Sequence, residues 1–301
     1  MVLKFNQNFR VLVAAIGFSM PAGAALAADP TTETTAAAPA SPPPSAAPAL
    51  WEIGIAGAGS YLPDYPAAEQ NHFKWIAAPY GVYRGRFVRA DKDGARTRLI
   101  HTKVYEMDMS VAASFSSSAK DNDAREGMPD LDYLLELGPR LSFALSDLGG
   151  RGKLRLFAPL RAVFSTDLGD FQHRGYTAAP AINLHWFIRP HSEHMLFAQI
   201  TSSFGNRQLN AYFYDVKPQF AKPDRAFYDA RGGYIGSDFY IGMLSPINKH
   251  LRAFYGGQIL NHSGAANETS PLFKNHFNYS GAVGLIWMMF ESKTPAIAAD
   301  E

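Results

Sequence analysis

Residues 133–145 read Tyr-Leu-Leu-Glu-Leu-Gly-Pro-Arg-Leu-Ser-Phe-Ala-Leu, and large apolar residues occupy nearly every second position of this stretch. The apolar set is Tyr133, Leu135, Leu137, Leu141, Phe143 and Leu145, and the polar set between them is Glu136, Arg140 and Ser142. Successive side chains of a β-strand point to opposite faces of the sheet. A period of two therefore predicts a long strand with one apolar and one polar face.

The same alternation continues on both sides of this stretch, from residue 51 to residue 292. In 153–164, Leu154, Leu156, Leu160 and Phe164 oppose Lys153, Arg155 and Arg161. We predict twelve strands, at 51–61, 73–83, 86–91, 95–101, 104–116, 132–146, 153–165, 174–189, 194–205, 233–245, 250–262 and 276–290. The short pair at 86–91 and 95–101, joined by Lys92-Asp93-Gly94, is the least regular. Without that hairpin the count would be ten.

Strand length and aromatic placement favour a membrane protein over a soluble β-sandwich. Several predicted strands run twelve to sixteen residues, which suits tilted strands that cross hydrocarbon. Aromatic residues gather near strand ends, at Trp51, Tyr61, Phe73, Trp75, Trp186, Phe187 and Trp287, as in interfacial girdles. Because lipid leaves unpaired strand edges unsatisfied, the sheet must close. The predicted fold is all-β, a closed antiparallel transmembrane β-barrel.

Connection lengths alternate along the predicted barrel. Short connections lie at 147–153, 190–194 and 246–250, and long ones at 117–131, 206–233 and 263–275. Outer-membrane barrels have short periplasmic turns and long external loops. We therefore expect the short turns and both chain ends on the periplasmic side.

The two ends of the chain differ from the barrel in composition. Residues 1–27 are typical of a cleaved signal peptide, with Lys4 and Arg10 before an apolar stretch and Ala25-Leu26-Ala27 at its end. Residues 28–50 are rich in Pro and Ala and predict a disordered spacer or tether, and residues 293–301 form a tail. The net charge is +1 and cysteine is absent. These facts exclude disulfides and thiol chemistry and give no reason to expect nucleic-acid binding.

Six charged residues are expected on the polar face of three adjacent strands: Glu106, Asp108, Glu136, Arg140, Arg155 and Arg161. If they face the lumen they form a network of opposite charges. One interpretation is a constriction that selects or blocks solutes. The interpretation that we favour is structural, because a narrow barrel fills its interior with mutually paired polar groups.

One predicted loop is acidic, with Asp121, Asp123, Asp130 and Asp132 around Gly127. Oxygen ligands of this kind suit Ca²⁺, but the spacing of an EF-hand is missing and Arg125 lies among them. A loop built on side-chain turns of Asp and Asn explains the composition better. We predict no metal and no cofactor.

Nucleophilic hydrolysis has one weak candidate, His262 and Ser263 with Glu268. A general base must lie within hydrogen-bonding distance of its nucleophile, whereas neighbouring strand residues point to opposite faces. His191 and His194 fall in a short turn, and no phosphate-binding or dinucleotide motif is present. We predict that the protein is not an enzyme and has no catalytic residues.

Several short motifs in fixed order resemble the MipA/OmpV family of outer-membrane proteins. The most specific lie in Tyr61-Leu-Pro63-Asp64-Tyr65, in Asp121-Asn122-Asp-Ala-Arg125 and in Gly127-Met128-Pro129-Asp130-Leu-Asp132. Others are Tyr83-Arg-Gly-Arg-Phe87, Glu136-Leu-Gly-Pro139, Tyr214-Asp215-Val216, Tyr228, Gly233-Tyr234, Ser263-Gly-Ala-Ala and Ser270-Pro-Leu272. The similarity extends over the whole predicted barrel.

The resemblance implies an outer-membrane scaffold for murein synthesis. It implies a lytic transglycosylase and a bifunctional penicillin-binding protein as partners, and other family members are discussed as surface adhesins. We also expect contacts with the lipid bilayer, lipopolysaccharide and the barrel assembly machinery. One departure is the end of the chain: Gly284-Leu-Ile-Trp287-Met-Met289 resembles an assembly signal, but the chain continues to Glu301. The alternatives are a narrow solute pore, an adhesin and a lipid-modifying hydrolase.

Overall fold

The computed structural model describes residues 49–84, 88–91, 94–101, 105–149, 151–167, 169–189 and 194–294. The predicted signal peptide, residues 28–48 of the leader and most of the tail lie outside these ranges. So do parts of two predicted turns, Lys92-Asp93 and 190–193, the latter with His191, and residues 85–87 of one family motif. No helix in the described ranges is long and apolar enough to span a membrane.

The described residues form thirteen strands in one antiparallel sheet, with one α-helix and three short 3-10 helices in the connections. The first seven strands are β1 (Trp51–Pro63), β2 (Asn71–Arg84), β3 (Val88–Asp91), β4 (Gly94–His101), β5 (Tyr105–Ser114), β6 (Tyr133–Asp147) and β7 (Gly152–Thr166). The others are β8 (Phe171–Ala178), β9 (Ala181–Phe187), β10 (Met195–Gly205), β11 (Gly233–Pro246), β12 (Leu251–Asn261) and β13 (Phe277–Glu291). The helices are η1 (Ala119–Asp121), η2 (Asp123–Arg125), α1 (Arg207–Tyr214) and η3 (Pro218–Phe220).

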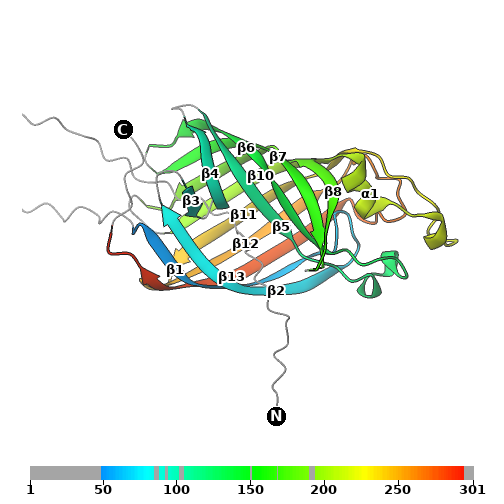
Figure 1. Ribbon diagram of the computed structural model, residues 1–301, viewed down its shortest axis with the longest axis horizontal. Coiled ribbons are helices and arrows are strands. Elements are labelled where there is room, and N and C mark those ends of the chain that lie inside the picture. The colour runs from blue at the N-terminus through cyan, green and yellow to red at the C-terminus, as the bar shows by residue number, and fades with distance from the viewer. Residues whose placement is uncertain are drawn as a thin grey trace, which may run out of the picture.

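The strand pairings follow chain order and return to their starting point. From β11 the pairings pass through β12 and β13 to β1, continue through β2 to β10, and β10 pairs again with β11. Figure 1 shows the long strands running obliquely around a common interior. Among the described residues, the ladder between β2 and β3 is short and pairs Tyr83↔Ala90 and Arg84↔Arg89.

The prediction of one strand at 174–189 was wrong in detail. The structure divides it into β8 and β9, and this division gives thirteen strands in place of twelve. Both pieces pair with β7 and with β10 in an unchanged register on either side of the break. Pro180 lies in the break, and proline has no backbone N–H to donate to a ladder. β8 and β9 therefore occupy the place of a single strand in the sheet, and this strand is interrupted locally.

The two faces of the sheet have opposite chemistry. Large apolar side chains are exposed on the outward face, among them Ile55 on β1, Leu141 on β6 and Leu285 on β13. Inward-facing Asp108 and Arg140 are buried. The alternation predicted for residues 133–145 is therefore present in β6. The outward apolar surface has no protein packed on it in the described chain.

The long connections gather at one end of the sheet, on the right in Figure 1. They are residues 64–70, 115–132, 206–232 and 262–276, and together we call them the cap. The sequence predicted these segments as loops, but one of them contains helix α1. Asn206 caps this helix by accepting a hydrogen bond from the backbone N–H of Leu209 at 3.1 Å.

Candidate functional site

The cap has a hydrophobic core of its own. Its buried members come from all four connections and from the strand ends beneath them: Tyr65, Ala67, Ala68, Leu131, Leu134, Val163, Leu209, Phe213, Tyr214, Val216, Ala230, Ala265, Leu272 and Phe273. Burying apolar surface from segments far apart in the chain stabilises their association. The connections therefore form one folded unit over the end of the sheet.

Arg125 is buried at the centre of the cap. Its guanidinium donates to the carbonyl oxygens of Phe213 at 3.0 Å and Pro129 at 3.2 Å. It also lies over the ring of Tyr65, 5.7 Å from the ring centroid. Burial lowers the pKa of Arg125 and raises the pKa of Tyr65. One side chain thus joins three of the four connections.

A second buried arginine holds the tip of the longest connection. Arg225 donates to the carbonyl oxygens of Ala124 at 2.9 Å, Glu126 at 3.0 Å and Phe220 at 2.9 Å. The two arginines therefore bind backbone carbonyl groups that no strand ladder would satisfy. Leaving such buried acceptors unpaired would cost about 1–3 kcal/mol each.

The first family motif continues this network. Asp64 accepts from Asn122 Nδ2 at 2.7 Å and lies 2.8 Å from His72 Nδ1. The hydroxyl of Tyr65 donates to the carbonyl of Leu272 at 2.8 Å. Tyr61 points outward from β1 and is exposed, and Pro63 ends that strand. The motif thus spans the boundary between strand and cap.

The acidic loop carries the second motif, and its members have different environments. Asp130 accepts from the backbone N–H of Ala119 at 2.7 Å, and the backbone N–H of Asp132 donates to the hydroxyl of Tyr212 at 2.7 Å. Gly127 has a φ of 75°. Met128 is partly buried and packs against the cap core. Asp121 and Asp123 are exposed. In the described residues no group of three or more His, Asp or Glu side chains is arranged to hold a metal ion.

Four of the six charged residues expected in the lumen meet in two ion pairs. Arg140 Nε and Nη2 donate to the two carboxylate oxygens of Asp108 at 3.1 and 2.8 Å. Arg161 Nη1 lies 3.3 Å from Glu136 Oε2. Arg161 Nε also donates to Ser110 Oγ at 2.9 Å. Glu106 lies on β5 opposite Ser142 and Arg155 on β7 opposite Asn183, and neither takes part in these two pairs.

Toward the short turns the interior holds both charged and apolar side chains, and there Arg252 Nη1 lies 3.7 Å from Glu52 Oε2. Met195, Phe197, Leu244, Phe254 and Ile286 form a buried cluster, which we call the apolar cluster. Between the apolar cluster and the cap lies a cavity of about 500 Å³, which we call the chamber. The interior is thus layered as cap, chamber and apolar cluster.

The hydrolase candidate is not assembled by the hydrogen bonds in this region. His262 is buried, and its Nδ1 lies 3.0 Å from the carbonyl oxygen of Ile235. Burial lowers the pKa of His262. Glu268 bonds to His276 and to the backbone N–H of Gly264. Each of these two side chains therefore has partners other than Ser263.

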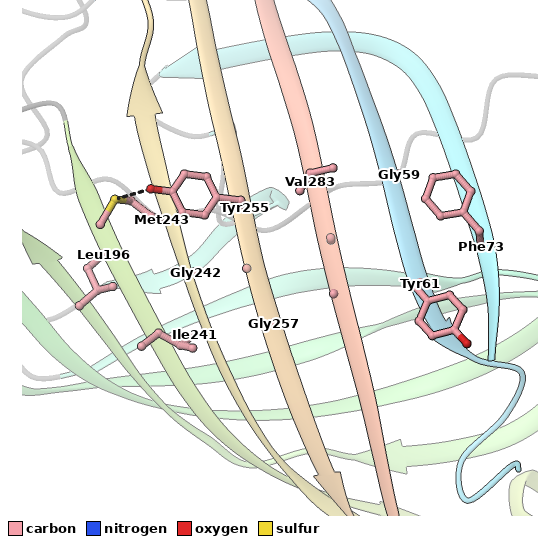
Figure 2. Close-up of a pocket in the computed structure, with 13 residues that line it drawn as sticks. Gly59, Tyr61, Phe73, Leu196, Ile241, Gly242, Met243, Tyr255, Gly257 and Val283 are labelled. Carbon is pink, nitrogen blue, oxygen red and sulfur yellow. Dashed lines mark hydrogen bonds between the residues drawn. The ribbon is translucent and has the colours of Figure 1, made fainter. Parts of the chain in front are cut away.

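A second hollow, of about 600 Å³, lies on the apolar outward face and has no charged lining residue (Figure 2). Outward-facing glycines form its floor, at Gly59, Gly257 and Gly281, and aromatic side chains border it, at Tyr61, Phe73 and Tyr255. The hydroxyl of Tyr255 donates to Met243 Sδ at 3.1 Å. We call it the outer groove.

These observations define a class: an all-β antiparallel protein with an apolar outer face, a paired polar interior and a folded cap. The chain belongs to the MipA family, because the family model described as MltA-interacting protein MipA matches residues 55–289. The resemblance found in the motifs is thereby confirmed.

Comparison with solved structures gives distant matches. A bacterial polysaccharide outer membrane secretin is 9% identical, with 80% of this chain and 99% of that chain covered and a TM-score of 0.37. The outer membrane protein OprG from Pseudomonas aeruginosa is 10% identical, with 81% and 95% covered and a TM-score of 0.19. No curated protein matches the chain.

Proposed function

We propose that this protein is a closed β-barrel of the outer membrane that acts by binding rather than catalysis. Its role would be that of a scaffold between the membrane and murein enzymes. The observation that carries the membrane assignment is the outward surface, where Ile55, Leu141 and Leu285 are exposed. Such surface is unfavourable in water but suits hydrocarbon. The pairing of β10 with β11 supports closure.

The membrane assignment has a direct test. The mature protein, folded in detergent, should migrate faster before boiling than after boiling in a denaturing gel, because a closed barrel resists the detergent. It should also fractionate with outer-membrane vesicles. A mature chain that stays monomeric in buffer without detergent would contradict the proposal.

The scaffold role is supported by the family description, which names an interaction with MltA. The short turns at the end opposite the cap are the described segments that a periplasmic enzyme would meet first. Ile247 stands out there, because this large apolar side chain is 58% exposed in the turn between β11 and β12. Arg151 and Lys249 are also exposed at short turns. A large apolar side chain that is exposed to water can serve as a contact for a protein partner.

A pull-down with a matched pair of variants tests this surface. Immobilised mature protein in detergent should retain a lytic transglycosylase of the MltA type and a bifunctional penicillin-binding protein. Ile247→Asp should reduce retention at least tenfold, because it places a charge in the contact. Phe227→Asp, at a similarly exposed position in the cap, should have no effect. Equal retention by both variants would refute the short-turn surface, and no retention by the unmodified protein would refute the scaffold role.

The layered interior supports binding over conduction. The apolar cluster and the cap lie at the two ends of the chamber, so among the described residues apolar side chains interrupt its polar lining at both ends. We therefore expect no stepwise conductance in planar bilayers. Regular openings that disappear in Arg140→Ala would favour a pore.

A further inference from the structure

The chamber has an unusual set of charges in its lining. Four carboxylates line it, from Asp64, Asp132, Glu136 and Asp238, and no lysine or arginine belongs to the described lining. Tyr65, Phe115, Tyr212, Phe213 and Tyr240 add aromatic surface. Carboxylates beside aromatic rings, in a cavity whose described lining has no lysine or arginine, favour a positively charged ligand.

Three of these carboxylates have positively charged or titratable partners. Asp64 lies against His72, Glu136 against Arg161, and Asp132 is 3.8 Å from Arg174. Asp238 differs from them. It accepts from Gln258 Nε2 at 2.8 Å and from the hydroxyl of Thr201, and none of the ion pairs of the described residues includes it. It is the chamber carboxylate with neutral partners only.

The partners of Asp238 hold it in place. Ser280 Oγ donates to Gln258 Oε1 at 3.0 Å, and this bond fixes the amide so that its nitrogen faces Asp238. Tyr240 lies two residues further along the same face of β11, and its ring stacks on Phe197 with centroids 5.3 Å apart. A fixed carboxylate and an immobile aromatic ring therefore stand side by side on one wall of the chamber.

We propose that the chamber binds a small organic ammonium ion, with Asp238 as its counter-ion and Tyr240 as an aromatic contact. Asp238 is partly buried, and a carboxylate that has lost part of its hydration is stabilised by a paired cation. An ammonium group supplies the missing charge, and the carbon chain of the ligand contacts the aromatic lining. This site goes beyond the proposed scaffold role and does not depend on it.

Calorimetry on the full mature protein in detergent micelles tests the site, with 1,4-diaminobutane as the probe. The unmodified protein should bind the diamine and not the uncharged 1,4-butanediol. Asp238→Asn, which keeps the shape and removes the charge, should weaken binding at least tenfold. Asp167→Asn, at an exposed carboxylate in a connection outside the chamber lining, should bind as the unmodified protein does. Equal binding by Asp238→Asn, binding of the diol, or no binding of the diamine would overturn the proposal.

A second measurement needs no variant and so is independent of any folding defect. Carbodiimide with glycinamide modifies accessible carboxyl groups, and Asp238 is the only acidic residue in the tryptic peptide 232–249. Tetramethylammonium, which cannot itself be coupled, should reduce modification of this peptide at least threefold. Modification of the peptide 162–174, which contains Asp167, should not change. Equal modification of peptide 232–249 with and without the cation would overturn the proposal.

Discussion

The wall of the sheet and the cap are held together by different kinds of bonds. In the wall, backbone ladders between neighbouring strands provide most of the order, as between β6 and β7 from Tyr133↔Thr166 to Asp147↔Lys153. In the cap, buried side chains bind backbone carbonyls across long sequence distances, as Arg125 does to Phe213. The wall is thus built from one repeated type of bond, whereas each bond of the cap joins a different pair of groups.

This difference predicts two separate modes of failure. Loss of an inward charge in the wall should lower the stability of the whole barrel. Loss of a cap arginine should release the connections and leave the barrel intact.

The largest effect is expected in the wall, at Asp108. The Asp108→Asn variant leaves Arg140 buried without an anion, and breaking a buried ion pair in this way costs about 3–5 kcal/mol. The free energy of unfolding in urea, measured in detergent micelles, should fall by that amount. Removing both charges in Asp108→Asn with Arg140→Leu should cost less than Asp108→Asn alone, because no unpaired charge remains. A double variant less stable than the single variant would contradict the role of the pair.

The next effect is expected in the cap, at Arg125. Arg125→Met keeps much of the buried volume but leaves the carbonyls of Phe213 and Pro129 without this donor, a cost of about 3 kcal/mol to the cap. Trypsin should cleave the connection between β10 and β11, for example after Arg225, much faster than in the unmodified protein. The gel shift on heating should remain.

Arg207→Ala, which removes an exposed ion pair with Asp229, is the control and should leave the cleavage rate unchanged. Cleavage at the normal rate in Arg125→Met would refute this role.

The wall was predictable from sequence because its pattern repeats. Alternation repeats along every long strand, so an error at one position changes little, and residues 133–145 alone predicted which side chains of β6 face inward. The break at Pro180 was missed because the same alternation continues on both sides of it. Ion pairing between Asp108 and Arg140 could be anticipated, because both residues lie on the polar faces of strands expected to be adjacent.

The cap could not be predicted, because its contacts depend on how four connections meet in space. The acidic composition of 121–132 suggested a hydrogen-bonded loop but not that Arg125 would bind Phe213, 88 residues away. Helix α1 has eight residues, too few for a clear periodic pattern. The chamber was missed for a related reason. In the sequence, Asp238 and Gln258 each resemble an ordinary inward-facing polar residue. The register of β11 and β12, which the sequence does not give, is what brings the two residues together.

Two glycines of the wall differ in how closely the backbone of the neighbouring strand approaches them. At Gly138, a Cβ atom would lie 2.1 Å from the carbonyl oxygen of Leu160 on the neighbouring strand, whereas at Gly257 the nearest atom would be 3.6 Å away. Gly138→Ala should therefore lower the free energy of unfolding by about 1–3 kcal/mol through backbone displacement. Gly257→Ala, in the outer groove, should change it by less than about 0.5 kcal/mol. Equal unfolding midpoints in urea would show that the close approach of β6 and β7 is not required.

The smallest effect is expected from pH at the cap surface. Hydrogen bonds from His276 and from the backbone N–H of Gly264 lower the pKa of Glu268 below its ordinary value of 4.5. A carboxyl group whose folded pKa is depressed stabilises the fold above its unfolded pKa, and this contribution is lost as the pH falls through the folded pKa. The connection 262–276 should therefore open more readily below pH 4.5, while the wall strands do not respond. Hydrogen exchange at the amide of Gly264, compared with the amides of β12, measures this difference.

The Glu268→Gln variant is the control. At neutral pH the amide of Gly264 should exchange faster in this variant than in the unmodified protein. Below pH 4.5 the amide of Gly264 should show no further local opening beyond that of the β12 amides. A local pH response that persists in that variant would assign the effect to another group of the cap.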